Sequence, residues 1–169
     1  MIRIGILGDI GSGKSYVSTK FGYPVFDADK EVNKLYLKNK KVFKKLSRVL
    51  PKYIKFFPIN KHQIISAILA NEQNLKKIIK IIHLEVRKKM KIFLKKNINK
   101  KAVVLDIPLL LENKLNKKKD ILVFVQSNKS FVLKRLKKRR NFNLKLVKKF
   151  KTIQLPLDYK KKKSHFIIK

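Results

Sequence analysis

Short apolar runs alternate along the chain with longer stretches in which apolar residues recur every three or four positions. The runs are bounded by charged residues or by glycine, which is typical of buried strands in a parallel sheet. They predict strands over residues 1–7, 24–26, 102–105, 121–125 and 166–168.

The stretches with spacing of three and four predict helices. They cover residues 14–20, 30–37, 61–96, 130–138 and 144–154, and a short helix is expected to begin at 109–111. The polar residues 71–74 can divide the longest stretch into two helices. Residues 38–60 are rich in lysine and contain Pro51 and Pro58, so we expect a mixture of short helix and loop there.

The alternation of strand and helix predicts an α/β fold, with an open parallel sheet covered by helices on both faces. A length of 169 residues without an internal repeat or a linker indicates a single domain. No apolar run approaches the roughly 20 residues that cross a bilayer, and the first run is too short for a signal peptide. We therefore expect no membrane partner. The chain has no cysteine, so we also expect a cytoplasmic protein without disulfides.

Residues 8–15 have the sequence Gly-Asp-Ile-Gly-Ser-Gly-Lys-Ser, which satisfies the phosphate-loop pattern G-x-x-x-x-G-K-[ST]. The match follows a predicted strand and leads into a predicted helix, as the pattern requires. Four of the five glycines of the chain fall between residues 5 and 13. Glycine is therefore concentrated where the backbone has to approach a ligand closely.

A loop of this kind binds the phosphates of a nucleoside triphosphate through its backbone N–H groups. Lys14 is expected to reach the β- and γ-phosphate oxygens as a catalytic residue, and Ser15 is expected to bind Mg²⁺. ATP and Mg²⁺ are therefore the expected cofactors of a kinase. The predicted nucleotide-binding residues are Gly8, Gly11, Ser12, Gly13, Lys14, Ser15 and Tyr16.

Carboxylates are scarce, because the chain has only 10 Asp and Glu residues. Asp27 and Asp106 each follow a predicted strand, at the edge of a parallel sheet where ligands bind. A kinase needs one carboxylate to orient or deprotonate the attacking hydroxyl and another to hold the water shell of Mg²⁺. The sequence leaves open which aspartate has which role. Asp29 is more simply explained as a helix N-cap.

Three of the six arginines, Arg135, Arg139 and Arg140, lie close together after the fourth predicted strand. The lid of a phosphate-loop kinase uses such guanidinium groups to neutralise the transferred phosphate. We therefore expect a lid near residues 135–150. A solvated basic helix is the alternative, because lysines flank the arginines.

The net charge is +35, from 45 Lys and Arg against 10 Asp and Glu. Such a charge suits binding to nucleic acid or to anionic lipid. Only six of the 45 basic residues are arginine, however, so a surface filled with lysine explains the charge better. We expect no specific nucleic-acid partner. A basic nucleic-acid-binding protein that retains a phosphate loop is kept as an alternative.

Five segments occur in the same order in dephospho-CoA kinases, and the chain resembles that family over nearly its whole length. They are residues 8–15, Asp-Ala-Asp at 27–29, 59–61 with the helix that leads to His83, Asp-Ile-Pro-Leu-Leu-Leu-Glu at 106–112, and Gln-Leu-Pro at 154–156. The phosphate loop marks only a superfamily, whereas the segments at 27–29 and 106–112 are more particular to this family.

The resemblance implies ATP-dependent phosphorylation of the ribose 3′-hydroxyl of dephospho-CoA, giving CoA and ADP in the last step of coenzyme A biosynthesis. Dephospho-CoA and ATP are the implied substrates. It also implies a three-layer α/β core, an inserted helical domain on the CoA side near residues 60–98, and the lid near 135–150. Another phosphate-loop kinase, acting on a small metabolite or a nucleotide, is the alternative.

The resemblance also implies roles for single residues. Asp27 looks like the catalytic base, with Asp106 near the metal and the acceptor. His83, Arg87 and Arg140 are the implied substrate contacts, and Arg140 is also expected to be a catalytic residue. From its position in a helix, however, His83 is more simply explained by packing or capping. The sequence does not set the oligomeric state.

The chain departs from the family pattern at several positions. Asp9 replaces the usual glycine and puts a negative charge in the phosphate loop, which predicts weaker ATP binding. Tyr16 occupies a position where the family has threonine, Lys61 one where it has arginine, and Leu84 one where it commonly has proline. Near its end the chain has His165 where the family has aspartate.

Overall fold

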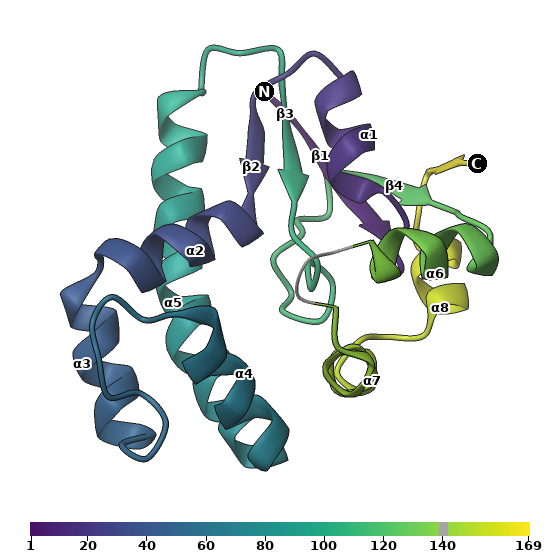
Figure 1. The fold of residues 1–169 in the computed structure, drawn as a ribbon. Helices are drawn as coiled ribbons and strands as arrows, with labels where there is room; N and C mark the ends of the chain where they lie inside the picture. The colour runs from purple at the N-terminus through teal and green to yellow at the C-terminus, as the bar shows by residue number, and fades with distance from the viewer. Residues whose placement is uncertain (139–141) are drawn as a thin grey trace. The chain divides into compact units, whose positions relative to one another are not determined.

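The computed structural model describes residues 1–138 and 142–169. The chain divides into two compact units (Figure 1). The first unit consists of Met1–Ala28 and Phe93–Lys169 and contains the sheet, whereas the second consists of Asp29–Ile92 and is helical. We call them the sheet unit and the helical unit.

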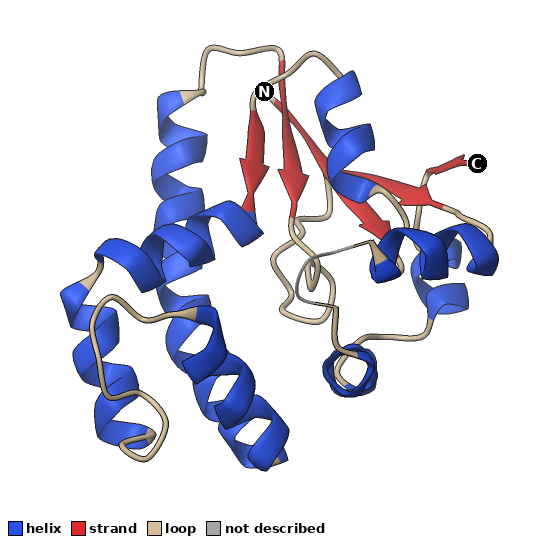
Figure 2. Ribbon diagram, in the orientation of Figure 1, coloured by secondary structure: helices blue, strands red, loops and turns tan. Residues whose placement is uncertain are grey.

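The sheet unit is built on a five-stranded sheet in which every pair of neighbours is parallel (Figure 2). Its strand order is β2-β3-β1-β4-β5. The strands are β1 (Ile2–Gly8), β2 (Val25–Asp27), β3 (Ala102–Asp106), β4 (Ile121–Val125) and β5 (Phe166–Ile168). The predicted α/β fold with a parallel sheet is confirmed, and the predicted strand ranges differ from the observed ones by one residue at most.

Both faces of the central strand β1 are covered. On one face Ile4 and Ile6 are buried in a cluster against which Val17 and Phe21, from α1 (Lys14–Lys20) and its end, are packed. On the other face a Cβ on Gly5 would lie 2.5 Å from Leu110 Cδ2. The segment after β3 therefore packs directly on the backbone of β1, which leaves no room for a side chain at residue 5.

Three further helices follow in the sheet unit, namely α6 (Lys129–Lys137), α7 (Leu144–Thr152) and α8 (Leu157–Lys162). The first two were predicted, and each begins at an asparagine whose side chain accepts a backbone N–H: Asn128 from Ser130 and Asn143 from Leu146. Helix α8 was not predicted, because it is only six residues long and follows Pro156.

The prediction of a short helix that begins at residues 109–111 is wrong. Residues 107–115 form successive turns, in which Leu110 N–H donates to Ile107 O and Leu115 N–H donates to Leu110 O. Lys114 has a positive φ of 52°, which interrupts helical geometry. We refer to residues 107–115 as the turn segment.

The helical unit contains α2 (Ala28–Lys38), α3 (Lys40–Val49), α4 (Lys61–Ala70) and most of α5 (Glu72–Lys96). Asn71 is extended and separates α4 from α5, which confirms that the long helical stretch is divided within residues 71–74. Residues 38–60 combine α3 with loop, also as predicted. None of the helices within the described residues is long and apolar enough to cross a membrane.

The edge strand β5 pairs with β4, and His165, just before β5, extends that contact. Its N–H donates to Leu122 O at 2.8 Å, and its Nδ1 accepts the N–H of Leu122 at 3.0 Å. An aspartate would offer a carboxylate oxygen as the acceptor. The departure from the family pattern at this position therefore keeps a hydrogen-bond acceptor for Leu122.

We expect His165→Ala to lower the free energy of unfolding by about 1–2 kcal/mol, because Leu122 N–H loses its acceptor in a partly buried place. His165→Asn keeps an acceptor and should cost less than half of that. Urea unfolding at neutral pH measures both values. Equal losses in the two variants would contradict the role of Nδ1.

Candidate functional site

The loop between β1 and α1 requires its glycines. Gly8, Gly11 and Gly13 have φ values of 146°, 82° and 97°, in the region that favours glycine. A Cβ on Gly8 would lie 2.7 Å from Val125 O and 2.8 Å from Ser12 Oγ. The loop therefore turns tightly against the end of β4, as a phosphate loop does.

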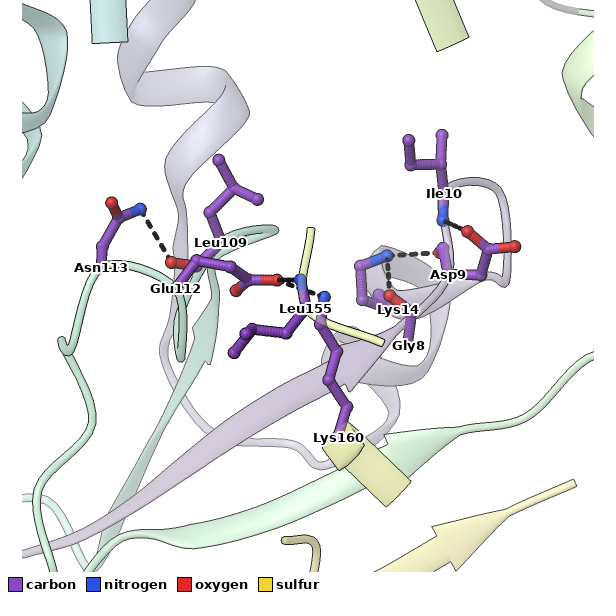
Figure 3. A network of polar contacts seen from close by, with 9 residues as sticks. All are labelled: Gly8, Asp9, Ile10, Lys14, Leu109, Glu112, Asn113, Leu155 and Lys160. Carbon is purple, nitrogen blue, oxygen red and sulfur yellow. Dashed lines mark hydrogen bonds and ion pairs between the residues drawn. The ribbon is translucent and has the colours of Figure 1, made fainter. Parts of the chain in front are cut away.

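The Lys14 ammonium lies across this loop (Figure 3). Its Nζ donates to Asp9 O at 2.6 Å and to Gly8 O at 3.2 Å, and the residue is 9% exposed. Ser15 and Tyr16 are exposed in the first turn of α1, and the N-cap of that helix is Gly13, which has no side chain to cap it. The loop thus presents a fixed positive charge beside an accessible hydroxyl.

The Asp9 carboxylate is held at both oxygens. Its Oδ1 accepts the N–H of Ile10 at 2.7 Å, and its Oδ2 lies 3.5 Å from Lys151 Nζ in α7. Lys151 offsets part of the negative charge that this residue brings into the loop. That Asp9 weakens ATP binding stays a prediction.

Arg135 of α6 also holds the loop. Its Nη1 donates to Ser12 O at 3.0 Å and to Ser127 Oγ at 3.1 Å, and it lies 3.5 Å from Gly11 O. From the sequence Arg135 was assigned to the lid cluster and was not among the predicted site residues. The contact joins residues more than 120 positions apart, so no local pattern could have indicated it.

Asp27 and Asp106 are brought together by the sheet. They are direct partners in the register of β2 and β3, whose neighbouring backbones lie about 4.8 Å apart. Paired residues on neighbouring strands point to the same face of a sheet. Asp106 is buried, at 4% exposure, whereas Asp27 is half-buried. Two carboxylates therefore lie side by side at the carboxyl edge, one on β3, which pairs with β1, and one on the edge strand β2 beyond it.

These groups suit Mg²⁺, which prefers hard oxygen ligands and keeps several waters. Ser15 Oγ and one of the two aspartates are the residues that could bind it. Over residues 1–138 and 142–169 no three His, Cys, Asp or Glu side chains gather into a metal site. Phosphate oxygens and water would have to supply the remaining ligands.

His83 and Arg87 lie one turn apart on α5, in the helical unit. Burial lowers the pKa of His83, and the positive charge of Arg87 lowers it further. The neutral imidazole is therefore favoured at neutral pH, where it can donate or accept a hydrogen bond. The predicted role of both residues in substrate binding stays a prediction. Arg140, which was predicted to contact the substrate and to act in catalysis, lies outside the described residues.

The model of the dephospho-CoA kinase family matches residues 2–169. The chain belongs to this family. It is 33% identical over 170 residues to the dephospho-CoA kinase of Wolbachia sp. subsp. Brugia malayi, covering 98% of this chain and 87% of that protein. It is 30% identical over 171 residues to that of Zymomonas mobilis, covering 99% and 87%.

Solved structures agree with the fold. The structure of TT1252 from Thermus thermophilus has a TM-score of 0.77 and 27% identity, covering 98% of this chain and 86% of that chain. Dephospho-CoA kinase from Campylobacter jejuni has a TM-score of 0.59 and 23% identity over the same shares. The family assignment and the fold expected from the sequence are therefore confirmed.

We expect Arg135→Gln to weaken MgATP binding about tenfold, since a hydrogen bond to a charged group contributes roughly 1.5–3 kcal/mol and the carbonyls of the loop lose theirs. Lys134→Gln, on the same helix and exposed, is the matched control and should leave the Kd unchanged. Titration with a fluorescent ATP analogue measures both. An unchanged Kd in Arg135→Gln would show that the loop does not depend on this contact.

Proposed function

We propose that this chain transfers the γ-phosphoryl group of ATP to the ribose 3′-hydroxyl of dephospho-CoA, giving CoA and ADP. The observation that carries the proposal is the phosphate loop beside the aligned Asp27 and Asp106, in a chain that belongs to the dephospho-CoA kinase family. The absence of cysteine supports a reducing compartment such as the cytoplasm.

Lys14 and the loop amides bind the phosphates in this proposal. The Lys14 ammonium now donates to two backbone carbonyls. Phosphate oxygens are stronger acceptors, because they are charged, so the ammonium can exchange one partner for the other with a gain. Bound Mg²⁺ would neutralise charge on the β- and γ-oxygens, with Ser15 as its protein ligand.

Asp27 is proposed as the base. A ribose hydroxyl is a poor nucleophile at neutral pH, and a carboxylate within hydrogen-bond reach can orient it and take its proton. Asp27 is half-buried and so more open to an acceptor than the buried Asp106. Asp106 is then the aspartate that would lie near Mg²⁺ and its water shell. The opposite assignment is the alternative.

Substrate binding is proposed for His83, Arg87 and Arg140. His83 and Arg87 come from the helical unit, Asp29–Ile92, which includes most of the proposed CoA-side insertion at 60–98. The lid is proposed for residues 135–150. Specific binding of nucleic acid is not part of the proposal, since the lysine-rich surface needs no such partner.

An acceptor comparison tests this function. Purified protein with ATP and Mg²⁺ is offered dephospho-CoA, shikimate and nucleoside monophosphates side by side, and the products are identified by mass spectrometry. We expect CoA as the main product, and a loss of at least about 10²-fold in Lys14→Ala, by analogy with the removal of one preorganised donor. Preferred phosphorylation of shikimate or a nucleotide would replace the proposal by the other kinase function.

Replacing each aspartate by asparagine separates the two roles. Asp27→Asn should lower kcat by about 10²- to 10⁴-fold, the usual contribution of general acid–base catalysis, with the Kd for MgATP unchanged. Asp106→Asn should weaken metal-dependent ATP binding and be partly relieved by excess Mg²⁺. If only Asp106→Asn loses turnover at unchanged affinity, the base is Asp106.

A further inference from the structure

A buried ion pair joins Glu112 to Lys160. The Lys160 Nζ lies 2.6 Å from Glu112 Oε1, and the two side chains are only 1% and 9% exposed. Removing two charges from water is costly unless further hydrogen bonds satisfy them. A buried pair is therefore weak evidence of stabilisation, and its role has to be found in what else the two side chains contact.

The same carboxylate oxygen holds the link between α7 and α8. Glu112 Oε1 accepts the N–H of Leu155 at 3.0 Å (Figure 3). Leu155 lies three residues after the end of α7, and Lys160 lies in α8. One carboxylate thus fixes the path of the chain where it leaves α7 and enters α8.

Glu112 itself stands on a rigid base. It belongs to the turn segment, which follows Asp106 at the end of β3. Leu110 in this segment is fully buried and packs on Gly5 of the central strand. Asn113 N–H and Nδ2 both donate to Leu109 O, at 3.2 Å and 2.8 Å, so the backbone beside Glu112 is also fixed.

Helix α7 has no comparable base of its own. None of its nine residues, Leu144–Thr152, is fully buried, and the structure describes all of them. Near its carboxyl end Lys151 meets Asp9 of the phosphate loop at 3.5 Å, and Leu155 meets Glu112. Because α7 is so little buried, these two polar contacts at its carboxyl end contribute strongly to the direction of the helix.

We propose that Glu112 is a positioning residue, which with Lys160 forms a fixed pivot for α7 and so holds Lys151 of that helix beside Asp9 of the phosphate loop. Lys160 neutralises the buried Glu112 carboxylate, which accepts the N–H of Leu155. The expected effect of Glu112 on turnover rests on the proposed kinase function. The expected effect of Glu112 on the position of α7 does not depend on that function.

Trypsin is a direct probe of the pivot, because α7 contains Lys145, Lys148, Lys149 and Lys151. In Glu112→Leu/Lys160→Met both charges are replaced by apolar groups of similar size, which leaves no unpaired buried charge. We expect this double variant to melt within a few degrees of the unchanged protein. Leu155 N–H nevertheless loses its acceptor, so tryptic cleavage in α7 should rise about tenfold through local opening, and kcat should fall by a similar factor.

Two matched variants complete the experiment. Glu72→Leu/Lys76→Met makes the same changes in an exposed ion pair of the helical unit and should alter neither cleavage nor kcat. Glu112→Gln/Lys160→Met keeps an acceptor of the same length for Leu155 and leaves no unpaired buried charge, so its cleavage rate should stay within about twofold of the unchanged protein. It also keeps the test decisive if Glu112→Leu/Lys160→Met does not fold, because fast cleavage in a variant that keeps the acceptor would contradict the role of that acceptor.

Unchanged cleavage in Glu112→Leu/Lys160→Met would overturn the pivot, as would equally fast cleavage in Glu112→Gln/Lys160→Met. Faster cleavage with unchanged kcat would overturn its part in catalysis. Failure of the unchanged protein to phosphorylate dephospho-CoA is a different result, because it rejects the proposed function. The cleavage rates decide on the pivot in either case.

Discussion

Parallel pairing of β1 between β3 and β4 is the constraint on which the rest of the sheet unit depends. Because all strands run in one direction, their carboxyl ends meet at one edge, and the phosphate loop and the two aspartates meet there too. The register makes Asp27 the partner of Asp106. A slip of one residue would turn one of them to the opposite face. The chemistry of the edge is thus a consequence of backbone hydrogen bonds within the sheet.

Around this edge the few acidic residues of the sheet unit have separate tasks. Asp9 meets Lys151, and Glu112 meets Lys160. At the opposite end of the strands Asp120 lies 3.0 Å from Arg3, which also donates to Leu115 O at 3.0 Å. Burial raises the pKa of Asp120, while the N–H of Lys117 and the charge of Arg3 act against that rise. The chain has a net charge of +35 and few carboxylates, and each of these three lies beside one particular lysine or arginine.

Phosphoryl transfer needs a rigid phosphate site and a cover that excludes water, and the two requirements oppose each other. The loop meets the first with its glycines and Arg135, which binds its carbonyls from α6. Helix α7 lies in the stretch proposed as the lid, and none of its residues is fully buried. The proposed pivot on Glu112 would meet both requirements, because it holds the carboxyl end of α7 beside the loop whether or not the rest of the helix closes over it.

The sequence by itself determined the phosphate loop, the strands, most of the helices and the family, since each of these appears in local periodicity or in a short motif. It also identified Asp27 and Asp106 as residues that follow strands, while the roles of these two stay predictions. Only the tertiary structure decided the strand order, the alignment of Asp27 with Asp106, the position of Arg135 on the loop and the contact of Glu112 with Leu155 and Lys160. It also replaced the short helix expected after residue 109 by turns. The physical reason is that local spacing reports which face of an element is apolar, whereas a contact between residues far apart in the chain depends on how the elements pack.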